Sequence, residues 1–375
     1  MEKNGDKEGE RVLLTGKRRA CPPVLSFPAT VNPVCDENVL TGLGKLGGSG
    51  FIASHVLDAL LDAGFQVVVT ARSKEKGERI VDSVQPRQVG YVVVDDIAQD
   101  GAFDQVFQSQ APFSYVVHTA SPYHLDVKDS VKDFLDPAIK GTTGVLKSIK
   151  KHGPTVKRVV ITSSSAAILN PANHAKVYDE TYWAPASVES ALSDPDRHAY
   201  TTSKVLAEKA AWAFVEDEKP NFDLATINCT YTFGPVQRKL PGLEAMNASN
   251  HRIRDMLQGR MMRSGLEPTA PVFTWVDVRD VAQAHLRAMT VPGAGGHRFY
   301  VVGGHFSNKR IADVLRENFP RLADRIPAGA VDDLPSDVYR FDNSKSREIL
   351  GIEYTPLEKS VVDTATSILE LFPDL

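Results

Sequence analysis

Tyr200 and Lys204 are the residues of this sequence whose types and spacing suggest acid–base chemistry. They stand four residues apart in a segment with helical periodicity, "AYTTSKVLAEKAAW", which places both side chains on one face of a helix. A nearby ammonium favours the ionised form of a phenol, so such a tyrosine can exchange protons near neutral pH. A hydroxyl from the serine-rich segment "VVITSSSAA" can hold a substrate oxygen beside it. We therefore predict proton transfer between Tyr200 and a substrate oxygen.

A glycine-rich turn that could bind a dinucleotide is split by a long segment. When residues 17–47 are removed, "RVLLTG" joins "GSGFIASH" and forms a strand, a glycine turn and a helix. Glycines are needed in such a turn because a side chain would block the pyrophosphate, which binds backbone N–H groups at the helix N-terminus. The residues expected to contact the cofactor here are Gly16, Gly48, Ser49, Gly50, Phe51 and Ile52.

Residues 17–47 have three interpretations. They can be a surface loop, or a translated intron, since their composition differs from that of the flanking sequence and they start directly after Gly16. Alternatively "NVLTG", with Val39 to Gly42, replaces "RVLLTG" as the first strand, which we rank lower because the following turn would then be several residues too long. We expect the segment to loop out while "RVLLTG" keeps its place in the sheet.

The residues after the second and third expected strands indicate which dinucleotide binds. The second strand is followed by Arg72 and Lys76 and by no acidic residue that would bind a free ribose hydroxyl. A guanidinium can pair with a 2′-phosphate, so this pattern favours NADP over NAD. Asp96 and Ile97 follow the third strand, where they can contact the adenine. Lys76 can equally be an exposed helix lysine, and Asp96 a turn residue.

Short apolar runs alternate with helical segments up to about residue 230. The expected strands are "RVLLTG", "FQVVVTAR", "GYVVVDD", "FSYVVHTA", "VKRVVITSSS" and "FDLATIN". Nearly continuous apolar strands separated by helices are typical of a parallel sheet that is covered on both faces. The expected helices include 51–63, 130–151, 281–289, 309–319 and 357–371. The predicted fold class is α/β, a doubly wound parallel-sheet Rossmann fold with a smaller C-terminal substrate lobe.

The expected domain division follows from this pattern. Residues 1–10 form a disordered tail, and residues 11–234 form the NADP-binding domain with 17–47 looped out. Residues 235–271 and 293–375 form the substrate-binding lobe, whereas 272–292 return to the first domain. The lobe is expected over the carboxyl ends of the strands, where ligands of doubly wound sheets bind.

Composition excludes several classes of protein. The 375 residues are 42% hydrophobic and carry a formal net charge of −4, which gives no electrostatic basis for nucleic-acid binding. No apolar run approaches the about 20 residues needed to cross a bilayer, and the first ten residues are charged, so we expect a cytosolic protein that does not bind membranes. Three irregularly spaced cysteines suggest neither a disulfide framework nor a metal site.

Several segments are specific to one family. The chain resembles an extended short-chain dehydrogenase/reductase, most closely the fungal carbonyl reductases of the methylglyoxal/3-methylbutanal reductase type, which are related to plant dihydroflavonol reductases. The segments that carry the resemblance include "GFIASHVLDALL", "VVHTASPYH", "YTTSKVLAEKAAW", "VDVRDVAQAHL" and "FDNSKSREILGIEY". They extend over nearly the whole chain.

The resemblance implies roles for individual residues. The catalytic serine of the family falls on Ser164, with Ser163 and Ser165 as alternatives, and Lys204 becomes the partner of Tyr200 and a ribose anchor. In the segment "HTASP", the residues that line the cofactor groove are Thr119, Ala120 and Ser121, whereas His118 is expected to be packed in its strand. Cys229 stands where the family has a proline beside the nicotinamide, and its backbone N–H is therefore available.

The function implied by the resemblance is NADPH-dependent reduction of an aldehyde or ketone to an alcohol. The partner is then a small-molecule carbonyl substrate, and the protein is a monomer or homodimer. Two alternatives remain: a nucleotide-sugar epimerase or dehydratase of the same fold, and a dinucleotide-binding protein whose catalysis is impaired by residues 17–47. The sequence does not identify the carbonyl compound.

Overall fold

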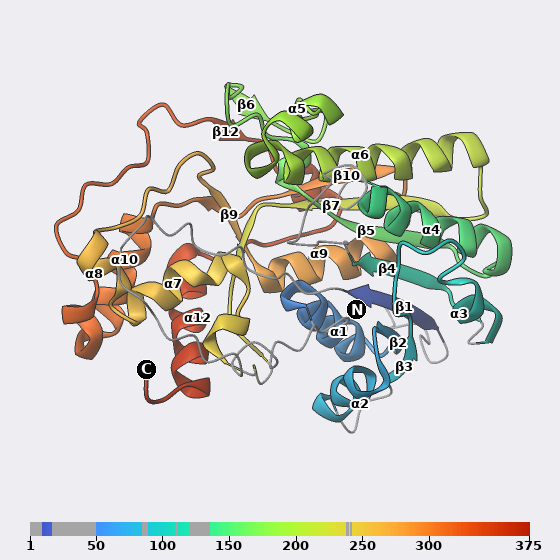
Figure 1. Cartoon of the computed structure of the whole chain (residues 1–375), viewed down its shortest axis with the longest axis horizontal. Helices are drawn as coiled ribbons and strands as arrows, with labels where there is room; N and C mark the ends of the chain where they lie inside the picture. Colours follow the sequence, from blue (N-terminus) through green and yellow to red (C-terminus); the bar gives the residue numbers. More distant parts are fainter. Residues whose placement is uncertain are drawn as a thin grey trace, which may run out of the picture.

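A computed structural model describes residues 10–16, 50–84, 89–109, 112–120, 136–237, 240 and 242–375. Its largest element is a seven-stranded sheet with the order β10-β7-β5-β4-β1-β2-β3, and every pairing in it is parallel (Figure 1). The strands are β1 (Arg11–Gly16), β2 (Gln66–Ala71), β3 (Val89–Val93), β4 (Tyr115–Thr119), β5 (Arg158–Ser164), β7 (Asp223–Cys229) and β10 (His297–Val301). The predicted α/β, doubly wound Rossmann fold is confirmed.

Helices cover both faces of this sheet (Figure 1). One face carries α1 (Phe51–Asp62), α2 (Lys74–Ser83) and α9 (Val278–Thr290), and the other carries α3 (Asp104–Ser109), α4 (Asp136–His152) and α6 (Pro195–Glu218). The side chains of β1 alternate between the two cores: Val12 and Leu14 pack with α1, whereas Leu13 packs on the opposite face. Burial on both faces explains why these strands are nearly continuous apolar runs.

The first strand is "RVLLTG", as predicted. β1 lies between β2 and β4, with Leu14 opposite Val69 on one side and Val117 on the other. The alternative that placed 39–42 in this position is therefore wrong, because Arg11–Gly16 occupies it. Residues 17–47, together with Gly48 and Ser49, lie outside the described residues.

The remaining elements lie outside the seven-stranded sheet. A three-stranded sheet contains β8 (Tyr231–Phe233), β9 (Thr274–Asp277) and β11 (Gly304–His305), and a two-stranded one contains β6 (Val177–Tyr178) and β12 (Arg340–Phe341). The other α-helices are α5 (Val188–Ser193), α7 (His251–Leu257), α8 (Arg260–Ser264), α10 (Asn308–Asn318), α11 (Ser344–Glu348) and α12 (Leu357–Leu371). Short 3-10 turns complete the set: η3 (Ser165–Ala167), η4 (Leu243–Ala245), η5 (Ala248–Asn250), η6 (Pro292–Ala294) and η7 (Pro320–Arg325).

One boundary of the expected domain division differs from the structure. β10 is an edge strand of the large sheet and pairs with β7, so the sheet takes in residues beyond 292 that were expected in the substrate lobe. α7, α10 and α12 share a separate core with Trp275 and Phe306. In the described ranges, no helix combines the length and apolar character needed to cross a membrane.

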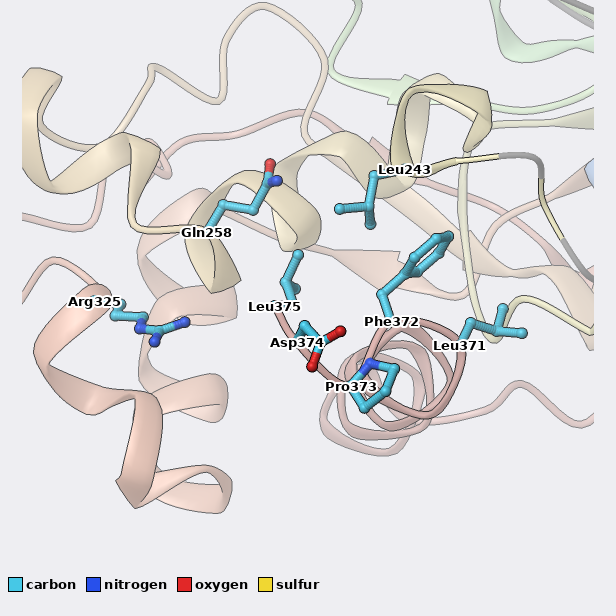
Figure 2. A pocket seen from close by; sticks show the side chains of 8 residues that line it. All are labelled: Leu243, Gln258, Arg325, Leu371, Phe372, Pro373, Asp374 and Leu375. Carbon is cyan, nitrogen blue, oxygen red and sulfur yellow. The ribbon is translucent and has the colours of Figure 1, made fainter.

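An open cavity of about 520 Å³ lies at the end of α12 (Figure 2). Its lining residues are Leu243, Gln258, Arg325, Leu371, Phe372, Pro373, Asp374 and Leu375. None of them belongs to the predicted catalytic or cofactor-binding residues. This cavity is therefore distinct from the candidate active site.

Candidate active site

Ser164, Tyr200 and Lys204 come together at the carboxyl end of β5. The hydroxyl of Tyr200 on α6 lies 3.5 Å from Ser164 Oγ and donates to it. The Lys204 ammonium lies 5.9 Å from the centroid of the Tyr200 ring, one helical turn further on. This arrangement gives two adjacent hydroxyl groups and a neighbouring positive charge, which is suited to binding and protonating a substrate oxygen.

The residues at the start of α6 favour a helix N-terminus. Asp194 caps the helix, since its side chain accepts from the backbone N–H of Arg197, and Pro195 occupies the first turn. The helix then runs for 24 residues and ends at Lys219, which has a left-handed φ of 41°. Tyr200 and Lys204 therefore lie within a long, regular helix, which keeps the spacing of their side chains constant.

The three serines at the end of β5 face different surroundings. Ser163 is 6% exposed, and its hydroxyl donates to Glu208 Oε2 over 2.5 Å. Ser165 is 7% exposed and begins the 3-10 turn η3. Ser164 is half-buried, and its Oγ accepts from the N–H of Ala166 over 3.1 Å while it contacts Tyr200. Of the three serines, Ser164 is therefore the one whose hydroxyl contacts Tyr200.

Glu208 is a residue that sequence reasoning missed. It is 2% exposed, although a carboxylate is rarely buried unless it is paired. Its donors are Ser163, Thr226, Asn228, Trp212 and Arg298, which come from α6, β5, β7 and β10. The available signal was its position four residues after Lys204 and eight after Tyr200, on the same helix face.

The start of α1 supplies the described part of the glycine turn. Gly50 precedes the helix in an extended conformation and makes no side-chain cap, and the first turn contains no acidic residue. Phe51 and Ile52 follow and are half-buried. The first N–H groups of a helix have no partner within it, and they form a favourable site for an anion.

Arg72 follows β2 directly and is half-buried. Within the described part of the chain, no carboxylate forms an ion pair with its guanidinium, whereas Lys76 lies half-buried on α2. Asp96 is exposed, and its carboxylate accepts from the N–H of Ala98 over 2.9 Å, as in the turn that we considered as the alternative. Ile97 packs against the core under α4.

The ends of β1 and β4 are joined by side chains. The hydroxyl of Thr119 donates to the carbonyl of Thr15, and the Thr15 hydroxyl lies 2.6 Å from His118 Nδ1. His118 is 1% exposed, as expected of a packed strand residue, and burial, assisted by the charge of Lys204, lowers its pKa to about 3. Ala120 is buried beside them, and Ser121 lies outside the described residues.

Cys229 ends β7 opposite Ser164 in the strand register. It is 6% exposed, its thiol lies 3.7 Å from the carbonyl oxygen of Ser163, and burial raises the thiol pKa. Its side chain is thus part of the core, and a contact with the cofactor would have to use its backbone.

The carboxyl ends of β1 and β4 lie at the point where the strand order reverses. From β1 the chain proceeds outward to β2 and β3, and β4 then starts the other half of the sheet. Ligands of open α/β sheets bind at this switch point. Arg72, Thr119 and Ser164 all lie at carboxyl ends of strands in this sheet.

The Rossmann sheet and the grouping of Ser164, Tyr200 and Lys204 define an extended short-chain dehydrogenase/reductase. A family model described as "NAD dependent epimerase/dehydratase family" matches residues 46–303, and the chain belongs to this family.

Individual relatives extend this similarity over most of the chain. Ketoreductase azaE of Aspergillus niger is 53% identical over 328 residues, which cover 86% of this chain and 96% of that protein. The NADPH-dependent methylglyoxal reductase GRE2 of Saccharomyces cerevisiae is 37% identical over 336 residues, 86% of this chain and 97% of the relative. A crystal structure of Gre2 from Candida albicans in complex with NADPH superimposes with a TM-score of 0.80 at 32% identity and covers 97% of this chain and 99% of that one.

Proposed function

We propose that the protein reduces an aldehyde or ketone to an alcohol with NADPH. The observation that carries the proposal is the 3.5 Å contact between the hydroxyls of Tyr200 and Ser164, with Lys204 one turn away. The names of the ketoreductase and methylglyoxal reductase relatives agree with this chemistry.

Each member of the group has a distinct task in this proposal. Ser164 donates a hydrogen bond to the carbonyl oxygen of the substrate, and Tyr200 gives its phenolic proton to the same oxygen as negative charge develops there. Lys204 supplies positive charge beside the phenol and holds the ribose of the cofactor. Bound NADPH would supply the hydride that reduces the carbonyl carbon.

The described residues fit NADPH. The first N–H groups of α1 have no partner within the helix, and its first turn contains no acidic residue, so its N-terminus suits a pyrophosphate. Arg72 stands where β2 ends, with no carboxylate of the described chain paired to it, and can contact the 2′-phosphate that distinguishes NADPH from NADH. Gly16, Gly48, Ser49, Lys76, Asp96, Ile97, Thr119, Ala120, Ser121 and Cys229 complete the proposed cofactor site.

Replacing Tyr200 with phenylalanine tests the proposed role. Only the transferable proton is lost, so reduction is expected to slow by about 10²–10⁴-fold while NADPH binding stays nearly intact. NADPH oxidation against a panel of aldehydes, α-ketoesters and diketones measures the first quantity, and titration with NADPH measures the second. Retention of more than about a tenth of the wild-type turnover, with the chemical step rate-limiting, would contradict the role of Tyr200.

A cytosolic location and a monomeric or homodimeric state complete the proposal. Sedimentation equilibrium of the purified chain distinguishes the two states, and fractionation of the source cells tests the location. A higher oligomer or a membrane-bound fraction would contradict these predictions.

A further inference from the structure

The carboxylate of Glu208 divides its partners between its two oxygens. Oε2 accepts from Ser163 over 2.5 Å and from Asn228 over 2.7 Å. Oε1 accepts from Thr226 over 2.9 Å, from Arg298 over 2.7 Å and from Trp212 over 3.5 Å. The partners of Oε2 directly precede Ser164 and Cys229, at the carboxyl ends of β5 and β7. The partners of Oε1 lie elsewhere: Thr226 within β7, Arg298 near the start of β10 and Trp212 on α6.

The two partners of Oε2, Ser163 and Asn228, both hold Ser164 in place. Ser163 precedes Ser164 on β5, so its hydrogen bond fixes the backbone that carries the substrate-binding hydroxyl. The amide nitrogen of Asn228 bonds Glu208 and also reaches the carbonyl oxygen of Ser164 over 3.4 Å. One carboxylate oxygen thus connects α6, which carries Tyr200, to the strand end that carries Ser164.

The Oε1 side neutralises and anchors the carboxylate. Arg298 of β10 pairs with Glu208 while its side chain is only 10% exposed, and its guanidinium lies 3.7 Å from the centroid of the Trp183 ring. Arg298 also donates to the carbonyl of Tyr182 over 2.8 Å. The negative charge is therefore compensated within the fold and stays in a fixed position.

We infer that Glu208 is a positioning residue that sets the separation between the hydroxyls of Ser164 and Tyr200. Both ends of the 3.5 Å contact are attached to this carboxylate, one through α6 and the other through Ser163 and Asn228. Hydrogen-bonding groups that act on a reacting oxygen must be held within a fraction of an ångström of their working geometry, since a 1 Å error can cost about 100-fold in rate. The inference rests on the proposed reductase function.

The bond from Ser163 can be removed without leaving a buried charge. Glu208→Gln is a poor test because it deprives Arg298 of its partner and can prevent folding. Ser163→Ala instead removes one donor from Oε2 and leaves the carboxylate with its other partners. Thr226→Val is the control, since it removes a buried hydroxyl that contacts Oε1 of the same carboxylate and the side-chain oxygen of Asn228, but leaves the amide nitrogen of Asn228 on Oε2 and the bond from Ser163 in place.

Three quantities are measured for the full-length chain and both variants: kcat, KM for NADPH and Tm. Ser163→Ala is expected to lower kcat by about 10- to 100-fold, with KM for NADPH within about twofold of the wild type. Thr226→Val is expected to keep kcat within about twofold of the wild type while it lowers Tm at least as much as Ser163→Ala does, because the Thr226 hydroxyl contacts both Glu208 and Asn228 whereas that of Ser163 contacts Glu208 alone among the described residues.

The outcomes separate the inference from the proposed function. Equal kcat in the wild type and Ser163→Ala, equal losses of kcat in both variants, or a change confined to KM would each overturn the positioning role. A wild-type chain that reduces no carbonyl compound would overturn the proposed function and the inference with it. A loss of kcat in Ser163→Ala alone, with Tm lowered at least as much in Thr226→Val, supports the inference.

Discussion

Replacing His285 with glutamine is expected to make the protein less sensitive to acid. His285 is fully buried on α9, where its Nδ1 lies 2.8 Å from the carbonyl oxygen of Val281 and its Nε2 lies 2.6 Å from the hydroxyl of Thr162 on β5. A carbonyl oxygen can only accept, so Nδ1 carries the proton and Nε2 accepts from Thr162. Glutamine can still accept from this hydroxyl, but it cannot be protonated.

The size of the effect follows from the pKa of His285. Burial lowers it from 6.5 to about 4, so below pH 6.5 the unfolded chain binds a proton that the folded chain does not. The stability that depends on the neutral ring is fully present above pH 6.5 and is lost as the pH falls towards 4. At pH 5 the loss amounts to about 2 kcal/mol, since one pKa unit corresponds to about 1.4 kcal/mol.

Urea unfolding at about pH 8 and about pH 5 measures this difference. Between these two conditions the wild type is expected to lose about 2 kcal/mol more free energy of unfolding than His285→Gln does. Because His118 is present in both proteins, its contribution cancels when the loss in His285→Gln is subtracted from the loss in the wild type. His285→Leu provides a second variant that cannot titrate, and it should show the same reduced dependence on pH even though it loses the bond to Thr162.

Equal losses in the wild type and in both variants would refute the reasoning. Such a result would mean that His285 is protonated as easily in the folded protein as in the unfolded chain. A smaller loss in His285→Gln alone would point to the hydrogen bond with Thr162 rather than to proton binding.

Two further predictions concern the cofactor. Arg72→Ala is expected to weaken NADPH binding by about 1.5–3 kcal/mol, or roughly tenfold to more than a hundredfold, and NADH binding much less. Titrations with both cofactors measure the two affinities. Equal weakening would show that Arg72 only packs against its neighbours. Deletion of residues 17–47, which joins Gly16 to Gly48, is expected to increase NADPH affinity and turnover because the pyrophosphate needs these glycines in one tight turn. Equal affinity and turnover in the two proteins would show that the segment does not affect function. Loss of folding on deletion would show that the segment is a structural part of the protein.

The sequence predicted six strands of the large sheet because parallel strands buried on both faces are continuous apolar runs. It missed β10, whose five residues, "HRFYV", begin with a histidine and an arginine. This strand can contain Arg298 because its guanidinium pairs with Glu208, 90 residues earlier in the chain. A partner at that separation leaves no periodic signal, so a local pattern could not identify the strand.

In the site, too, features local to one segment were predicted, whereas those that depend on distant segments were not. The spacing of Tyr200 and Lys204 is a local property of one helix, and it placed both residues on one face. The choice among Ser163, Ser164 and Ser165 was open because they are consecutive, and both Ser163 and Ser164 contact α6, the first through Glu208 and the second through Tyr200. Which hydroxyl lies beside Tyr200 depends on how α6 packs on the end of β5, and the sequence does not show this packing. The position of Glu208 on the helix face of Tyr200 and Lys204 was visible in the sequence, but its burial was not, since that depends on donors from β5, β7 and β10.

The central position of β1 has a consequence for how the chain is made. Among the strands of the seven-stranded sheet, β1 is synthesised first, yet its two edges are covered by β2 and by β4, which ends about a hundred residues later. At a synthesis rate of about 5–20 residues per second, this interval lasts roughly 5–20 s. During this time Val12, Leu13 and Leu14, all fully buried in the finished protein, have no sheet to join. Until β4 has been synthesised, β1 therefore keeps one edge unpaired, and an unpaired strand edge with apolar side chains favours aggregation.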